Sequence, residues 1–120
     1  MYRRYNPNAC GKKVGDCVIR ALSKGLGKDW YRVYIELCLY GLKSCDMPSS
    51  NSVWGKYLTD NGFFQEMTNN ITVRDFCEKH PEGTYILATG SHVICVIDGD
   101  YYDAWDSGEE EITSFFVKEY

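Results

Sequence analysis

The chain has 120 residues, of which 44% are hydrophobic and 15% aromatic, and its formal net charge is -4. This length suits one domain over residues 1–120 with a buried core, and the apolar content excludes a disordered chain. The only basic clusters are Arg3–Arg4 and Lys12–Lys13, too few for a nucleic acid surface. No apolar run is long enough to cross a membrane and none follows Met1, so we expect a cytoplasmic protein without a membrane or nucleic acid partner.

The segment KKVGDCVIRALSK predicts a first helix that begins after Asp16. Val18, Ala21 and Leu22 recur at helical spacing, and Asp16 is expected to cap the helix by accepting hydrogen bonds from first-turn amides. Cys17 then lies at the helix N-terminus, where unpaired N–H groups and the helix dipole favour a thiolate. Cys17 is therefore a candidate nucleophile, and the alternative is a small buried residue that begins a helix.

Three further helices are predicted before the sequence changes in character. Asp29 can cap the second helix, which carries an apolar stripe. The residues of that stripe are Trp30, Val33, Tyr34, Leu37 and Cys38. The third helix falls within residues 50–62. The fourth starts at Thr72, which forms a weak capping box with Asp75, and it stops at Pro81.

The last third of the chain predicts strands. The runs TYILATG, HVICVI and DYYDAW are short, rich in β-branched and aromatic residues, and separated by turn signals. Asp98–Gly99 between two such runs predicts a two-residue hairpin. The tail EITSFFVKEY, residues 111–120, can supply another strand. Helices followed by an antiparallel sheet make an α+β fold.

A nucleophilic cysteine needs a base, and the base needs a group that orients it. His80 lies at a helix end before Pro81, where we expect a structural role. His92 opens the strand HVICVI directly after a Gly-Ser turn, which makes it the candidate base.

The register of the predicted hairpin selects the orienting residue. With Asp98–Gly99 as the two turn residues, His92 faces Trp105, and Asp103 lies diagonally opposite His92 on the same face. A three-residue turn would instead pair His92 with Asp106 and reverse the faces. We prefer Asp103 and keep Asp106 as the alternative.

This order of a cysteine at a first helix, a histidine opening a strand and an acidic residue on the next strand resembles the papain-like cysteine peptidase superfamily. GDCVIRAL is similar to the helix-opening cysteine segment of bacteriocin-leader peptidases. HVICVIDGDYYDAWD resembles the histidine strand and hairpin of small NlpC-type members. The combination NPN…VGDCVIRAL…GSHVICVIDG…YDAWD also resembles short papain-like proteins encoded by phages and prophages.

The resemblance implies N-terminal helices packed on a C-terminal antiparallel sheet and acyl transfer through a thioester. Cys17 would be the nucleophile, His92 the base and Asp103 the residue that holds the imidazole ring. The substrate would be a peptide or protein, and neither a metal nor an organic cofactor is implied. The alternatives are a non-catalytic binding protein on the same fold, such as a phage factor that engages a host protein, and a transglutaminase or deamidase.

The oxyanion hole implied by the resemblance combines the Cys17 N–H with a side-chain amide. Papain relatives place a glutamine about six residues before the cysteine, and this chain has Gly11 there. Asn8 and Asn6 are the nearest amides and the candidates for the second donor.

Other conspicuous residues have structural interpretations. Cys38 and Cys95 are expected in the core, and no pair of cysteines has the spacing of a zinc site. Arg20 follows Cys17 by three residues, and we expect it in a surface ion pair. The tyrosines and tryptophans are expected to fill the core, with Trp105 or Tyr102 lining a groove as the alternative.

Overall fold

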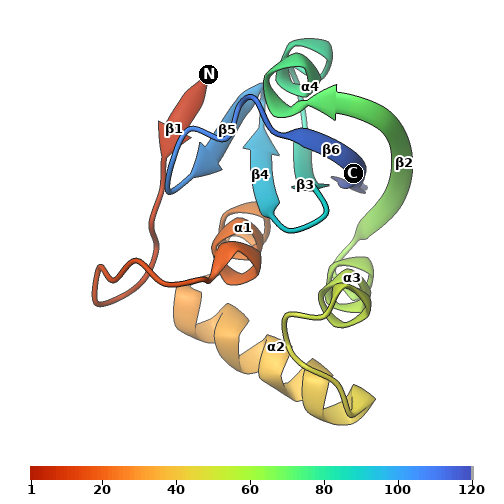
Figure 1. The fold of residues 1–120 in the computed structure, drawn as a ribbon. Helices are drawn as coiled ribbons and strands as arrows, with labels where there is room; N and C mark the ends of the chain where they lie inside the picture. Colours follow the sequence, from red (N-terminus) through yellow and green to blue (C-terminus); the bar gives the residue numbers. More distant parts are fainter. Residues whose placement is uncertain (120) are drawn as a thin grey trace.

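The structure is a computed structural model that describes residues 1–119, so Tyr120, the last residue of the predicted tail strand, lies outside the described residues. Within this range the chain forms four helices and six strands (Figure 1). In chain order these are β1 (Tyr2–Arg4), α1 (Cys17–Leu26), α2 (Trp30–Ser44), α3 (Asn51–Asp60), β2 (Phe63–Thr72), α4 (Val73–Lys79), β3 (Thr84–Ala88), β4 (Val93–Ile97), β5 (Asp100–Asp103) and β6 (Glu111–Lys118).

The six strands make one mixed sheet in the order β1-β5-β4-β3-β6-β2. Five strands pair in antiparallel fashion, but β1 lies parallel to β5, with Tyr2 opposite Tyr101. The α+β class is confirmed, and the prediction of a purely antiparallel sheet built after the helices is wrong. The reason is that β1 and β2, which come from the first two thirds of the chain, form the two edges of the sheet.

Side chains along β4 point alternately to the two faces of the sheet and are apolar on both, which explains why helices cover both faces. Val93 and Cys95 face one apolar cluster, which includes residues of α1, α2 and α3. Ile94 and Val96 face a second cluster, which includes residues of α4. In Figure 1, α1 lies against β4, α2 packs outside α1 and α3, and α4 lies at the far end of the molecule from α2.

Helix α1 approaches the sheet closely because it carries a glycine at the contact. A Cβ atom at Gly25 would lie 2.8 Å from Cδ1 of Ile86 on β3, a distance that side chains do not tolerate. Leu22, in the same helix, is fully buried. The position of α1 against β3 and β4 therefore follows from its own sequence, and this position fixes where the helix N-terminus points.

The predicted hairpin is confirmed. Asp98 and Gly99 have φ angles of 50° and 82°, as the two-residue turn requires, and Ile97 pairs with Asp100 across it. Thr72 also caps α4 as predicted, because its side chain accepts a hydrogen bond from the N–H of Asp75.

The predicted burial of α2 is only partly correct. Val33 and Leu37 are buried, but Tyr34 is 46% exposed and Cys38 is exposed. Helix α2 lies on the outside of α1 and α3. The part of its apolar stripe that meets the core is therefore narrower than the sequence pattern predicted. The prediction that Cys38 is a core residue is therefore wrong, while Cys95 is fully buried as predicted.

Two leucines in the chain test this division between core and surface. Leu87 on β3 is fully buried and Leu42 on α2 is 75% exposed. We expect Leu87→Ala to lower the free energy of unfolding by about 2–5 kcal/mol, because it removes buried methyl groups and leaves a cavity. The control Leu42→Ala should change it by less than about 0.5 kcal/mol. Urea denaturation measures both, and equal losses would contradict the layer arrangement.

Candidate active site

Cys17 is the first residue of α1, so its backbone N–H lies among the unpaired amides of the first helical turn. Its side chain is half-buried at the seam between α1 and β4. The thiol interacts with the His92 side chain and with the backbone N–H of Val93. The sequence prediction that Cys17 lies at the mouth of the helix is confirmed.

His92 immediately precedes β4 and is held by its own turn. The His92 N–H donates to Oγ1 of Thr89 at 2.9 Å, and the Thr89 N–H donates to the His92 carbonyl at 2.9 Å. The indole of Trp105 stacks on the imidazole with ring centroids 4.4 Å apart. This stacking leaves His92 only 7% exposed, while Trp105 itself is 50% exposed. Trp105 is therefore a cover over the imidazole and not core filling.

Asp103, at the end of β5, accepts the hydrogen bond of His92. The distance from His92 Nε2 to Asp103 Oδ2 is 2.7 Å, and Asp103 is fully buried. Because an ionised carboxylate only accepts, Nε2 carries the proton and Nδ1 is the ring nitrogen left for Cys17. The hairpin register thus brings together Cys17, His92 and Asp103, the three residues selected from the sequence.

The alternative orienting residue and the second histidine lie elsewhere. Asp106 accepts hydrogen bonds from the Tyr101 hydroxyl and the Gly108 N–H, and it lies 3.7 Å from Nη2 of Arg74. His80 ends α4, where its Nδ1 lies 3.0 Å from the Phe76 carbonyl. Neither residue is bonded to His92.

The charges of the three residues support one another. Burial alone would raise the pKa of Cys17, but hydrogen bonds from His92 and Val93 and the positive charges of His92 and Arg20 lower it below its ordinary value. Burial opposes protonation of His92, yet the hydrogen bonds and charges of Asp103 and Cys17 raise its pKa to about 9. A protonated imidazole beside a thiolate is therefore the favoured state near neutral pH.

Sequence reasoning missed the ion network beneath this site. Arg20 is 4% exposed and donates to both Asp16 Oδ1 at 2.6 Å and Asp103 Oδ1 at 3.1 Å, so the expected surface ion pair is buried. Asp16 makes no side-chain cap to α1, contrary to prediction, because its carboxylate binds Arg20 and the indole of Trp30. The signal available in the sequence was the i,i+4 spacing of Asp16 and Arg20, which places the two side chains next to each other on one side of the helix.

Asp103 has two further donors that the sequence did not single out. Oγ of Ser107 donates to Oδ2 at 2.6 Å, and the N–H of Ala104 donates to Oδ1 at 2.7 Å. Burial alone would raise the pKa of Asp103, but these bonds and the His92 imidazole hold it below its ordinary value. The carboxylate therefore stays ionised although it is buried.

The two asparagines proposed for the oxyanion hole make hydrogen bonds within their own loop. Nδ2 of Asn6 donates to the Lys12 carbonyl at 3.2 Å. Oδ1 of Asn8 accepts from the N–H groups of Cys10 and Lys12. Neither side chain is bonded to Cys17, which leaves the Cys17 N–H as the identified donor.

Comparison with family models, curated proteins and solved structures found no match to this chain. Among residues 1–119 there is no helix both long and apolar enough to span a bilayer. In the same range no group of three or more His, Cys, Asp or Glu side chains is placed to hold a metal ion, and all six cysteines are free. The likeness to papain-like peptidases stays a prediction from the sequence.

The raised pKa of His92 can be measured by NMR of ¹⁵N-labelled histidine. We expect the imidazole to stay protonated through pH 8 and to titrate near pH 9. Cys17→Ala should lower that pKa, because it removes a thiolate that stabilises the imidazolium. His80, on α4 and away from Cys17, provides the control signal and should not change in the variant. Titration of His92 near its ordinary value of 6.5 would contradict the ion pair.

The buried ion network makes a separate prediction about stability. Arg20→Met should lower the free energy of unfolding by about 3–5 kcal/mol, because it leaves the buried Asp16 without a cation and Asp103 with the His92 imidazolium alone. The matched control is Arg32→Met, since Arg32 also pairs at i,i+4, with Glu36, but is 63% exposed. We expect that control to cost less than about 1 kcal/mol by chemical denaturation. Equal effects would show that the Arg20 network contributes no more than a surface pair.

Proposed function

We propose that this protein is a cysteine peptidase or amidohydrolase with a papain-like fold, and that it acts by acyl transfer through a thioester. One observation carries the proposal. Cys17 on α1, His92 before β4 and Asp103 on β5 form a continuous chain in which the thiol pKa is lowered and the imidazole pKa is raised. A cysteine that only fills the core does not need a histidine and a carboxylate aligned with its thiol.

In the first step the Cys17 thiolate attacks the carbonyl carbon of the scissile amide. A C–S bond forms and the carbonyl electron pair moves to oxygen, where the Cys17 N–H at the start of α1 stabilises the negative charge. The His92 imidazolium then gives its Nδ1 proton to the leaving nitrogen, the C–N bond breaks and a thioester remains. Asp103 keeps the ring oriented throughout by accepting from Nε2.

In the second step neutral His92 removes a proton from water, and the resulting hydroxide attacks the thioester carbon. The C–S bond breaks, the acid product leaves, and Cys17 returns as a thiolate beside the imidazolium. Trp105 covers one face of the imidazole during both steps and keeps bulk water from competing for its protons. An amine in place of water would give transfer instead of hydrolysis.

A non-catalytic binding protein on the same fold is the second candidate, and one observation favours it. Nδ2 of Asn6 donates to the Lys12 carbonyl and Oδ1 of Asn8 accepts from Cys10 and Lys12, and neither amide is bonded to Cys17, so no second oxyanion donor is identified among the described residues. A hole with one donor stabilises the tetrahedral intermediate less, since each donor contributes about 10²–10³-fold in rate. The competing interpretations differ in whether Cys17 is reactive.

Alkylation by iodoacetamide between pH 5 and 9, mapped to each cysteine by mass spectrometry, tests the proposal. At pH 6 we expect Cys17 to react at least about tenfold faster than the exposed Cys10 and Cys45, because the lowered pKa of Cys17 keeps more of it as the reactive thiolate. These exposed cysteines are controls within the same chain. In His92→Ala the advantage of Cys17 at pH 6 should disappear.

The outcome separates the two candidates. A fast Cys17 that depends on His92 supports the hydrolase, and Cys17→Ala should then abolish any hydrolysis. A Cys17 that reacts no faster than Cys10 at pH 6 removes the catalytic proposal and leaves the binding protein.

A further inference from the structure

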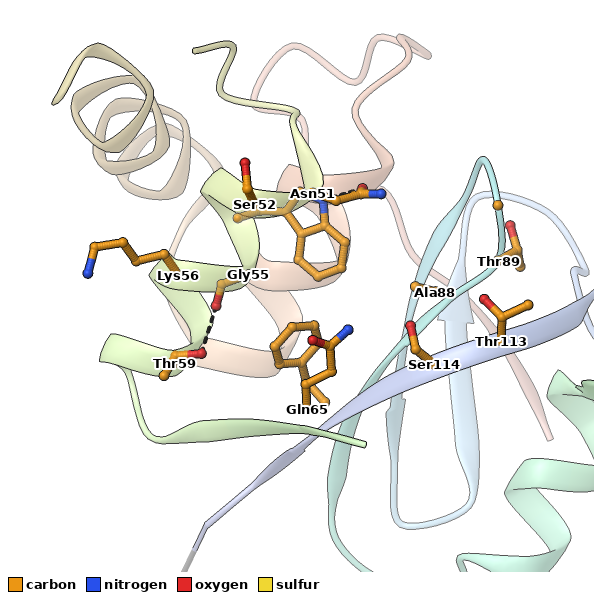
Figure 2. Close-up of a pocket in the computed structure, with 13 residues that line it drawn as sticks. Asn51, Ser52, Gly55, Lys56, Thr59, Gln65, Ala88, Thr89, Thr113 and Ser114 are labelled. Atoms are coloured by element: carbon orange, nitrogen blue, oxygen red, sulfur yellow. Dashed lines mark hydrogen bonds between the residues drawn. The ribbon is translucent and has the colours of Figure 1, made fainter. Parts of the chain in front are cut away.

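A groove of about 500 Å³ lies between α3 and the sheet (Figure 2). One wall is α3, through Asn51, Gly55 and Thr59. The opposite wall is the sheet side, formed by β2, β6 and the connection between β3 and β4. Trp54 and Phe116, whose rings lie 5.4 Å apart, are among its apolar lining residues.

The groove shares a wall with the catalytic histidine. Ala88, Thr89 and Gly90 line it, and Thr89 holds the backbone of His92 by two hydrogen bonds. In Figure 1 the same connection, drawn in cyan, extends between α1 and α3. A chain bound in the groove would therefore pass within a few residues of the Cys17–His92 pair.

Three polar side chains on the sheet side of the groove have no hydrogen-bond partner among residues 1–119. Ser114 on β6 is only 8% exposed, yet its hydroxyl makes no hydrogen bond within residues 1–119. Gln65 on β2 and Thr113 on β6 are likewise unbonded among the described residues, and Figure 2 shows both beside Ser114. Ser23 Oγ is the buried side-chain oxygen without a partner among the described residues, so the Ser114 hydroxyl is open to the groove and can hydrogen-bond a bound ligand.

Two polar groups of α3 differ, because they are bonded within the protein. Oδ1 of Asn51 accepts from the Trp54 indole at 3.0 Å, and the Thr59 hydroxyl donates to the Gly55 carbonyl at 2.9 Å (Figure 2). Gln65 and Ser114 on the sheet side therefore offer a ligand hydrogen bonds that these two groups of α3 do not.

The groove carries almost no charge. No carboxylate lines it, and its one cation, Lys56, pairs with Asp60 at 3.5 Å and points away from the groove in Figure 2. A charged ligand group would lose its water here without gaining a counter-charge, which is unfavourable. The lining instead suits groups that hydrogen-bond without being ionised.

We propose that this groove binds the substrate peptide and selects an uncharged polar side chain, such as Ser, Thr, Asn or Gln, close to the scissile bond. The proposal rests on the hydrolase function above. Ser114 and Gln65 exchange hydrogen bonds with that side chain, while Trp54 and Phe116 pack against its carbon atoms. Ser114 and Gln65 are thus residues that determine specificity.

Cleavage of a proteome-derived peptide library, with products mapped by mass spectrometry, tests this selection. We expect uncharged polar residues to be enriched at one position within about three residues of the cleaved bond, since an extended chain advances roughly 3.3 Å per residue. Ser114→Ala should reduce that enrichment by roughly 5-fold, as expected for one neutral hydrogen bond. The control Ser44→Ala makes the same change at an exposed position on α2 and should keep the wild-type profile.

A second variant fills the groove without touching the core. Gly90 lines the groove and a Cβ atom there meets nothing within 4 Å, so we expect Gly90→Leu to fold and to add a bulky side chain at the groove wall. We expect it to abolish the positional preference. Circular dichroism checks that both variants are folded.

Each outcome decides one of the two proposals. Cleavage with no positional preference, or with one that both variants leave intact, overturns the groove assignment and keeps the hydrolase. No cleavage with a Cys17 that alkylates rapidly at pH 6 overturns a peptide as the substrate class. No cleavage with a Cys17 that alkylates like Cys10 overturns the hydrolase and the groove proposal with it.

Discussion

The structure of the site depends on one buried carboxylate. Asp103 is fully buried, and its two oxygens accept from the imidazole of His92, the guanidinium of Arg20, the hydroxyl of Ser107 and the N–H of Ala104. A buried negative charge is unfavourable unless every lone pair direction has a donor. These donors come from α1, from the segment before β4 and from the chain just after β5, so satisfying Asp103 requires all three to assemble.

This requirement ties the helix to the sheet. Cys17 and Arg20 lie three residues apart on α1 and hence on the same side of the helix. The bond from Arg20 to Asp103 sets how α1 is rotated about its axis, and that rotation presents Cys17 to His92. The close approach at Gly25 sets the distance of the helix from the sheet. Rotation and distance together determine the geometry of the candidate nucleophile and base.

Features that arise from local interactions could be predicted from the sequence, whereas those that need distant partners could not. The Asp98–Gly99 turn determines its own register, which is why Asp103 could be chosen over Asp106. The edge strand β2 escaped prediction because most of its side chains are exposed on both faces, so it has no alternation to detect. Arg20 was misplaced because its second partner lies 83 residues further along the chain.

The five charged groups form an alternating series from Asp16 through Arg20, Asp103 and His92 to Cys17. Moving a proton from the Cys17 thiol to His92 leaves the net charge of this group unchanged, and the two charges that form are opposite and adjacent, so their attraction offsets the cost of burying them. Arg20 alone would oppose a second cation nearby, but Asp16 neutralises Arg20 and leaves the charge of Asp103 to stabilise the imidazolium. Asp16 directly precedes Cys17 in the chain. It nevertheless acts on the Cys17 thiol through three intervening groups, Arg20, Asp103 and His92.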